Sequence, residues 1–353
     1  MPTTYAIPNG ATAFAATTYT GTNANQNILN SNNTTTGISF QPDFVWIKDR
    51  TNAYASNLVD SIRGSHGVLI SSSTAVESTS TGTTGVLSFN SNGFSLGLDT
   101  STSGATNTNT DAFVAWQWKA GGTSSSNTNG SITSTVSVNA TAGFSVVTYT
   151  GTGAVGTVGH GLGVAPSMII AKRRSTTGNW PVYHISVGNN QGCFLNLTNA
   201  VNSQPNFWNS TTPTSSVFTV GTDTETNASG TTLVAYCWAQ IPGYSKFGSY
   251  TGNGSTDGPF VYCGFRPRFL VIKRTDTAGG WYTYDSSRST YNLNATVLQP
   301  NLSDAEGTFT NNSYDFLSNG FKNRGSGGDN NASGGTYIYM AFAENPFKYA
   351  NAR

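Results

Sequence analysis

The sequence predicts an all-β protein built from tandem antiparallel β-sandwiches of jelly-roll or lectin-like type. Three observations support this fold class. A short strand-like block occurs three times, other landmarks keep a similar spacing around each copy, and Gly, Ser, Thr and Asn dominate the composition. These residue types favour turns and β-surfaces. Each copy spans about 100 residues, the size of one small sandwich and too long for a solenoid unit.

The repeated block runs from a proline to a lysine six positions later. It occurs at residues 42–48 (Pro-Asp-Phe-Val-Trp-Ile-Lys), 166–172 (Pro-Ser-Met-Ile-Ile-Ala-Lys) and 267–273 (Pro-Arg-Phe-Leu-Val-Ile-Lys). A largely apolar run between a proline and a lysine predicts a strand buried on both faces. Proline suits the first residue of a strand, where no ladder N–H is needed. We therefore expect three central strands in three equivalent domains.

Two further landmarks accompany each block. Tyr-Thr-Gly precedes it at residues 19–21, 149–151 and 250–252, and an aromatic strand follows it at residues 113–118, 233–238 and 337–342. The last two copies also share a tryptophan eight residues beyond the lysine, Trp180 and Trp281, where the first copy has Ser56. Repeat 1 is therefore the divergent copy.

The landmarks predict repeat 1 with an N-terminal arm at residues 1–119, repeat 2 at 143–244 and repeat 3 at 245–353. Residues 120–142 contain few large apolar side chains and are predicted to be a semi-flexible linker, although Ile132, Val136 and Val138 could form a short strand. The junction between repeats 2 and 3 is short and aromatic. We therefore expect these two repeats to pack together and repeat 1 to be the more independent unit.

Charge and hydropathy restrict the partners. Only 9% of the residues are charged and the net charge is +1, so no field attracts nucleic acid or an acidic membrane. No apolar run is long enough to predict a membrane span. The first 20 residues lack the basic start and apolar core of a signal peptide, so synthesis in a cytoplasm is expected. Proteins of virus particles and some ordinary cytosolic proteins combine these properties.

No catalytic or metal-binding pattern is recognisable in the sequence. The three histidines lack metal-ligand spacing, and no Gly-x-Ser-x-Gly motif occurs. Residues 158–163 (Val-Gly-His-Gly-Leu-Gly) lack the spacing of a phosphate-binding loop and predict a tight turn. The three cysteines do not form a disulfide framework, and Cys237 is predicted to be a buried apolar residue. We expect no enzymatic activity, no cofactor and no metal.

Matched charges occur after two of the blocks. Asp60 and Arg63 have the same spacing as Asp285 and Arg288, whereas repeat 2 has His184 and Val187 at these places. The interpretation at this point is a local surface ion pair, structural and of small energetic value.

Four aromatic residues are candidate glycan contacts: Trp180, Trp281, Tyr183 and Tyr284. Aromatic rings exposed on a rigid sheet could stack on sugars. The alternative is that each tryptophan covers the core of its own sandwich, which is the usual role of matched apolar residues in a repeat. The test is whether the two tryptophans are exposed together on one face. The Asn-x-Ser triplets at residues 227–229 and 331–333 are interpreted as chance occurrences.

Three phrases carry a resemblance to a known family. They are Phe-Val-Ala-Trp-Gln-Trp-Lys-Ala-Gly-Gly at 113–122, Gly-Tyr-Ser-Lys-Phe-Gly-Ser-Tyr-Thr-Gly-Asn-Gly at 243–254, and Ala-Phe-Ala-Glu-Asn-Pro-Phe-Lys at 341–348. The chain resembles repeat-containing structural, tail-fibre-like proteins of marine bacteriophages over nearly its whole length, most strongly from residue 144 onward. The resemblance implies repeated β-sandwich domains and a virion component, and it offers no catalytic residues to carry over.

The expected function is therefore that of a non-enzymatic structural protein of a bacteriophage virion, in a fibre, a tail appendage or a capsid decoration. The alternative is a carbohydrate-binding module for host recognition. Expected partners are other copies of the chain and other virion proteins, with a host-surface glycan as a further candidate, and neither nucleic acid nor membrane insertion. By analogy with phage proteins we expect a homo-oligomer, a trimer, made in the host cytoplasm. The segments expected to reach a neighbour are residues 1–17, an arm or a first edge strand, and residues 346–353.

Overall fold

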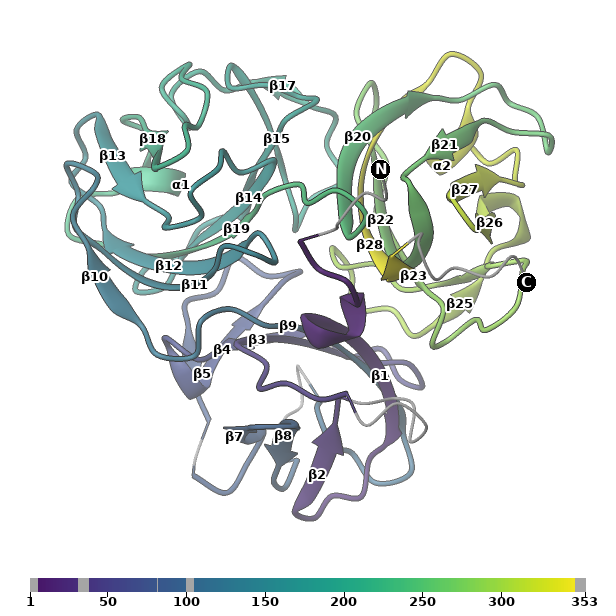
Figure 1. Cartoon of the computed structure of the whole chain (residues 1–353), viewed down its shortest axis with the longest axis horizontal. Helices are drawn as coiled ribbons and strands as arrows, with labels where there is room; N and C mark the ends of the chain where they lie inside the picture. The colour runs from purple at the N-terminus through teal and green to yellow at the C-terminus, as the bar shows by residue number, and fades with distance from the viewer. Residues whose placement is uncertain (1–5, 31–37, 81, 100–104, 347–353) are drawn as a thin grey trace.

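In the computed structural model, which describes residues 6–30, 38–80, 82–99 and 105–346, three β-sandwiches surround a common centre (Figure 1). The all-β sandwich prediction is confirmed. Each sandwich has an inner sheet facing the centre and a smaller sheet or hairpin outside it. All named strand pairs are antiparallel, as expected for sandwiches joined by short turns.

Repeat 1 follows the short 3-10 helix η1 (Gly10–Thr12). Its inner sheet has the order β1-β9-β3-β4-β5-β6, and its outer sheet the order β2-β8-β7. The strands are β1 (Phe14–Thr20), β2 (Gln26–Leu29), β3 (Phe44–Asp49), β4 (Asn57–Asp60), β5 (Gly64–Ile70), β6 (Ser78–Thr79), β7 (Val86–Asn90), β8 (Gly93–Leu96) and β9 (Ala112–Trp118).

Repeat 2 has the inner order β10-β11-β12-β19-β14-β15-β16-β17 and the outer pair β13-β18, with the short helix α1 (Thr224–Asn227) before the closing strand. The strands are β10 (Ser125–Asn127), β11 (Ser134–Asn139), β12 (Phe144–Thr150), β13 (Gly156–Gly159), β14 (Met168–Arg173), β15 (Pro181–His184), β16 (Gln191–Phe194), β17 (Asn202–Ser203), β18 (Val217–Val220) and β19 (Thr232–Trp238).

Repeat 3 has the inner order β20-β28-β22-β23, the outer order β21-β27-β26 and a two-stranded ladder β24-β25. The short helices are η2 (Thr310–Asn312) and α2 (Gly328–Asn331). The strands are β20 (Ser245–Thr251), β21 (Phe260–Tyr262), β22 (Phe265–Arg274), β23 (Trp281–Asp285), β24 (Thr296–Val297), β25 (Gly307–Thr308), β26 (Tyr314–Leu317), β27 (Gly320–Asn323) and β28 (Thr336–Pro346).

The same strand order and register recur in all three repeats. In every repeat the closing aromatic strand lies between the first strand and the block strand. The residues in register, in the order first strand, closing strand and block strand, are Phe14, Trp118 and Phe44; Phe144, Trp238 and Met168; and Ser245, Phe342 and Phe269. The three blocks are therefore central strands, paired on both sides.

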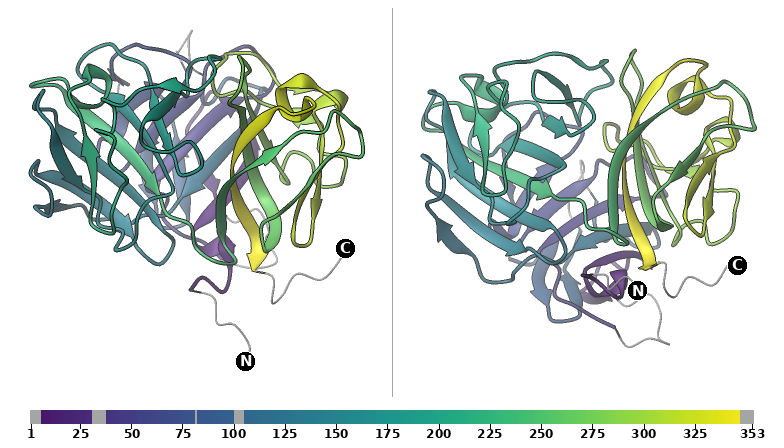
Figure 2. Two further views of the ribbon diagram at one scale, coloured as in Figure 1. Left: turned by 90° about the horizontal axis from the view of Figure 1, so that it is seen from above. Right: turned by 45° about the horizontal axis from the view of Figure 1, so that its top comes forward.

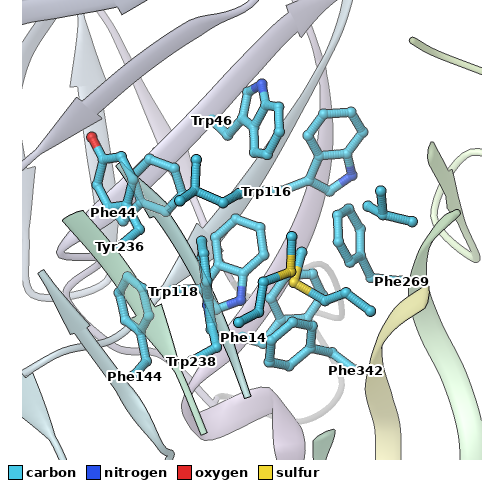
Figure 3. Packing of buried hydrophobic residues seen from close by; sticks show 14 of the residues in the cluster. Phe14, Phe44, Trp46, Trp116, Trp118, Phe144, Tyr236, Trp238, Phe269 and Phe342 are labelled. Carbon is cyan, nitrogen blue, oxygen red and sulfur yellow. The ribbon is translucent and has the colours of Figure 1, made fainter. Parts of the chain in front are cut away.

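The inner sheets meet in one aromatic core, here named the central cluster. Its labelled members in Figure 3 are Phe14, Phe44, Trp46, Trp116, Trp118, Phe144, Tyr236, Trp238, Phe269 and Phe342. The Trp118 ring lies 5.9 Å from that of Trp238 and 5.7 Å from that of Phe342, so rings from all three repeats touch. The opposite faces of the inner sheets pack in three separate sandwich cores. Each block is thus buried on both faces, as predicted.

Two predictions about domain organisation are wrong. Residues 120–142 are not a linker, because β10 and β11 lie within them and β11 pairs with β12 from Ser134↔Tyr149 to Asn139↔Phe144. Small polar side chains suit such a sheet edge, which needs little apolar area. Repeat 1 is not the more independent unit, because Trp118 lies within the shared core. Figure 2 shows the three units enclosing that centre from two further directions.

The N-terminal segment is an edge strand rather than a free arm over its described part. Phe14 opens β1 and stacks against Phe342 of repeat 3, with ring centroids 5.3 Å apart. Before it, η1 lies against β28, where a Cβ added to Gly10 would come within 2.9 Å of the Ala343 carbonyl oxygen. Residues 1–5 and 347–353, which belong to the predicted contact segments, lie outside the described residues.

Each Tyr-Thr-Gly landmark anchors a turn. The hydroxyls of Tyr19, Tyr149 and Tyr250 each donate, at 2.7 Å, to a backbone carbonyl directly preceding a buried asparagine. A Cβ on the glycine would lie 2.0 to 2.4 Å from a carbonyl oxygen in all three copies, so only glycine fits there.

The buried asparagines complete these turns. Asn107, Asn227 and Asn331 accept from the backbone N–H that follows each glycine, at 2.8 to 2.9 Å. Each side-chain amide donates to two backbone carbonyls. Asn227 and Asn331 head the two Asn-x-Ser triplets, so these two asparagines have a structural role in the repeat, which they share with Asn107.

Candidate functional site

Polar and charged side chains gather where the repeats meet, beginning with the block lysines. Lys48, Lys172 and Lys273 are buried at matched positions. Each lysine ammonium donates to the backbone carbonyl of the residue six positions later in the sequence, in the same repeat. Each also reaches a carbonyl of a neighbouring repeat: Ser303 at 2.9 Å, Thr74 at 3.0 Å and Thr198 at 3.3 Å, respectively. Repeat 1 thus bonds to repeat 3, repeat 2 to repeat 1 and repeat 3 to repeat 2, which closes a ring.

The contact between repeats 2 and 1 contains a buried ion network, here named contact 2–1. The Arg63 guanidinium lies 2.5 Å from Asp60 and 2.7 Å from Glu77. The Tyr236 hydroxyl donates to Asp60 at 2.9 Å, and Arg174 pairs with Glu77 at 2.9 Å. Arg63 and Asp60 side chains are 0% exposed, so the predicted surface pair of small value is wrong: these charges are desolvated and depend on one another.

The contact between repeats 1 and 3, contact 1–3, repeats this arrangement. Arg288 lies 2.6 Å from Asp285 and 3.0 Å from Glu306. The Trp116 indole N–H donates to Asp285 at 3.0 Å, and Arg50 pairs with Glu306 at 2.7 Å. Burial acts to raise the pKa of Asp285, but Arg288 outweighs it and holds that pKa below its usual value. The Asp285 carboxylate therefore stays ionised, and its role is to hold Arg288 and Trp116 in the contact.

The contact between repeats 3 and 2, contact 3–2, has no ion network at the matched positions. Equivalence follows from one backbone hydrogen bond present in all three contacts: Glu77 N to Arg174 O, Glu306 N to Arg50 O, and Val201 N to Thr275 O. The five matched residues are His184, Val187 and Val201 in repeat 2 and Thr275 and Met340 in repeat 3. All five positions thus differ from those of the other two contacts, and the set is largely apolar where theirs is largely charged.

His184 takes the place of the buried aspartate in contact 3–2. Its Nε2 lies 3.1 Å from the Tyr339 carbonyl oxygen and its Nδ1 accepts from the Ser186 N–H. Burial lowers the pKa of His184 to about 4, so the ring is neutral at neutral pH. The neutral ring fits a contact that offers no carboxylate.

The four candidate glycan contacts are buried. Trp180 and Trp281 lie between repeats, where the Trp180 indole N–H donates to the Ile70 and Ser73 carbonyls of repeat 1 at 3.1 Å. Trp281 donates to the Phe194 carbonyl of repeat 2 at 2.9 Å.

Tyr183 packs on Trp208 in the repeat 2 core, and Tyr284 donates to the Asn312 carbonyl in repeat 3. A sugar stacks only on an exposed ring face, so none of these four rings offers one in this structure.

Other reactive groups are also buried. All three cysteines are free and buried, and Cys237 is the small core residue that was predicted. Burial raises the pKa of Cys193 to about 12, which keeps it a thiol. Over the described ranges, no three His, Cys, Asp or Glu side chains gather where they would hold a metal ion. No helix in the described part of the chain has the length and apolar character needed to cross a membrane.

Sequence reasoning missed the asparagines and the contact networks. A signal existed for the asparagines, since Asn107, Asn227 and Asn331 each stand eleven residues ahead of the last aromatic of the closing strand. For the networks the signal was partial: the matched Asp-Arg spacing was visible, but nothing in the sequence indicated which repeat would supply the partner.

One family model matches the chain, over residues 9–346, and its description is a domain of unknown function (DUF7483). The chain belongs to this DUF7483 family. The matched region runs from η1 to the end of β28 and so contains all three sandwiches, which agrees with a single closed unit. No curated protein and no solved structure matches the chain. The resemblance to marine phage structural proteins stays a prediction.

Proposed function

We propose that this chain is a non-enzymatic structural component of a bacteriophage particle, located in a fibre, a tail appendage or a decoration of the capsid surface. The observation that carries the proposal is the closed ring of three sandwiches around the central cluster. Buried charged groups at two of the contacts help to hold the repeats together: Arg63 donates to the Tyr236 hydroxyl of repeat 2, and Arg288 lies over the Trp116 ring of repeat 1. Such a molecule is suited to being a rigid building block.

The resemblance carried by residues 113–122, 243–254 and 341–348 supports placing this building block on a phage particle. The charge-poor composition is a second support, because a net charge of +1 produces little repulsion between closely packed copies. The homo-oligomer, and the trimer in particular, stay predictions. The three-fold arrangement seen here lies within one chain, so a single copy could also occupy a three-fold position.

The test is mass spectrometry of purified particles from a phage whose genome encodes the chain, with copy number measured against the major capsid protein. A fixed stoichiometry after density-gradient purification is expected. Its absence from intact particles, together with abundance in the infected cytoplasm, would contradict the proposal. The solution mass of the purified chain separates one copy from a trimer.

A further inference from the structure

The outer sheet of repeat 3 carries exposed aromatic side chains. Phe260 and Tyr262 on β21 are 44% and 64% exposed, while Val261 between them is buried. This alternation turns both rings to the outside of the sandwich. Tyr291, 85% exposed, flanks the other edge of the sheet, because Asn292 exchanges hydrogen bonds with the backbone of Phe316 on β26. Among the described residues, every large aromatic side chain with such exposure lies in repeat 3.

The aromatic pair is specific to repeat 3. Val261 is in register with Phe321, as Ile28 is with Phe94 in repeat 1 and Val158 with Phe218 in repeat 2. The residues matched to Phe260 and Tyr262 are therefore Asn27 and Leu29 in repeat 1, and Thr157 and Gly159 in repeat 2. Since the other two sandwiches form without rings here, the common fold does not require Phe260 and Tyr262.

The rings do not serve merely to cover a glycine. A Cβ on Gly320 would lie 3.1 Å from Cε2 of Phe260, so that ring rests over Gly320 on β27. Gly320 is needed for another reason, because the same Cβ would come 2.0 Å from the Val261 carbonyl oxygen. Gly93 in repeat 1 has the same close approach, to Ile28, with no aromatic residue beside it. Phe260 is thus held beside the backbone of Gly320 while 44% of it remains exposed.

Charged pairs of both signs border the rings. Directly paired residues of an antiparallel ladder point to the same face, so Lys322 and Asp315 stand in one row with Phe260. Lys322 pairs with the exposed Asp257 at 2.8 Å, and Arg324 pairs with Asp315 at 3.1 Å. The border therefore offers both hydrogen-bond donors and carboxylate acceptors with no net charge.

We propose that this face of repeat 3 binds an uncharged oligosaccharide. The apolar face of a pyranose ring stacks on Phe260 and Tyr262, and its hydroxyls bond to Lys322 and Asp257. A few apolar rings with convergent polar groups at their border are the usual composition of a small-ligand site. A stable protein partner would need to bury a larger area than two rings bordered by ion pairs provide. The proposal is independent of where in a particle the chain resides.

The test titrates the full chain with cellohexaose, chitohexaose and maltoheptaose, each to about 10 mM, because glycan affinities near 1 mM correspond to only about −4 kcal/mol. Calorimetry and chemical shifts of labelled tyrosine and phenylalanine report binding. At least one of the three probes is expected to bind the wild type. The double variant Phe260→Ala with Tyr262→Ala should lose affinity about tenfold or more, since two stacking contacts disappear.

The matched control is the double variant Asn27→Ala with Leu29→Ala, which alters the same two positions in repeat 1 and should leave binding unchanged. Both altered pairs are on the surface, so urea unfolding should match the wild type and separate lost binding from lost folding. The proposal is overturned if none of the three probes binds the wild type, or if binding survives the Phe260 and Tyr262 double variant. It is also overturned if that variant changes only the oligomeric state, since the face would then be a protein interface.

Discussion

Contact 2–1 and contact 3–2 join equivalent surfaces by different chemistry. In contact 2–1, Arg63 is surrounded by two carboxylates and a tyrosine hydroxyl, all largely removed from water. In contact 3–2, the corresponding places hold Val187 and a neutral His184. The backbone hydrogen bond beside them is the same. The frame of the ring is therefore independent of the ion networks, whereas the members of each network depend strongly on one another.

The largest effect is expected from breaking one network. Arg63→Met leaves Asp60 buried without its cation, and removal of one partner of a buried pair typically costs about 3 to 5 kcal/mol. The free energy of unfolding, measured by urea denaturation, should fall by that amount. A loss below about 1 kcal/mol would show that water reaches Asp60 and that the network is not truly buried.

The next effect is the pH dependence that His184 contributes at contact 3–2. The folded pKa of His184, about 4, lies below its unfolded value of 6.5, so below pH 6.5 only the unfolded chain takes up this proton. Stability is then present above pH 6.5 and is lost as the pH falls toward 4. Between pH 7 and 5 the contribution of His184 should fall by about 2 kcal/mol. Urea denaturation of His184→Gln should show a smaller loss over this range; an unchanged loss would assign it to other groups.

Transferring the apolar set tests whether the five positions act as a unit. The combined variant converts contact 2–1 to the residues of contact 3–2: Asp60→His, Arg63→Val, Glu77→Val, Arg174→Thr and Tyr236→Met. Because replacing a whole buried ion network by apolar residues is often close to neutral, we expect a loss of only about 1 to 2 kcal/mol. Urea denaturation beside Arg63→Met provides the comparison. A loss exceeding that of the single variant would mean that the two contacts are not interchangeable.

The smallest effect is expected at the rim of the same network. Arg174 is 24% exposed, and Glu77 keeps Arg63 as a partner when Arg174 is removed. Arg174→Met should therefore lower the free energy of unfolding by about 1 kcal/mol or less. The difference between the Arg174 and Arg63 variants, measured in the same denaturation series, isolates the contribution of burial.

The elements that could be predicted from the sequence are those defined by local pattern. The block strands at residues 42–48, 166–172 and 267–273 each begin with a proline that is followed by an apolar run. Both signals lie within one short segment, so they could be recognised without knowing what packs against it. The strand at Ser134–Asn139, which lies between β10 and β12, was assigned to a linker because Val136 and Val138 are its only large apolar residues.

The assembly of the repeats could not be predicted in this way. Trp180 and Trp281 were recognised as matched residues. The sequence pattern of a buried apolar residue is the same, however, whether its side chain packs in its own sandwich or against a neighbouring one. The aromatic pair Phe260 and Tyr262 was not predicted as a site, because the prediction used residues that recur in all three repeats and this pair occurs only in repeat 3.

Closure of the ring has a consequence for synthesis. Lys48, in the first repeat to leave the ribosome, bonds to Ser303 in the last. At about 5 to 20 residues per second, completing the chain after repeat 1 has emerged takes roughly 10 to 50 s. Through that interval Phe14 and Trp118 lack the ring of Phe342 that covers them in the finished molecule. During this interval the nascent chain therefore exposes an aromatic surface that could associate with other proteins, until β28 is synthesised and covers it.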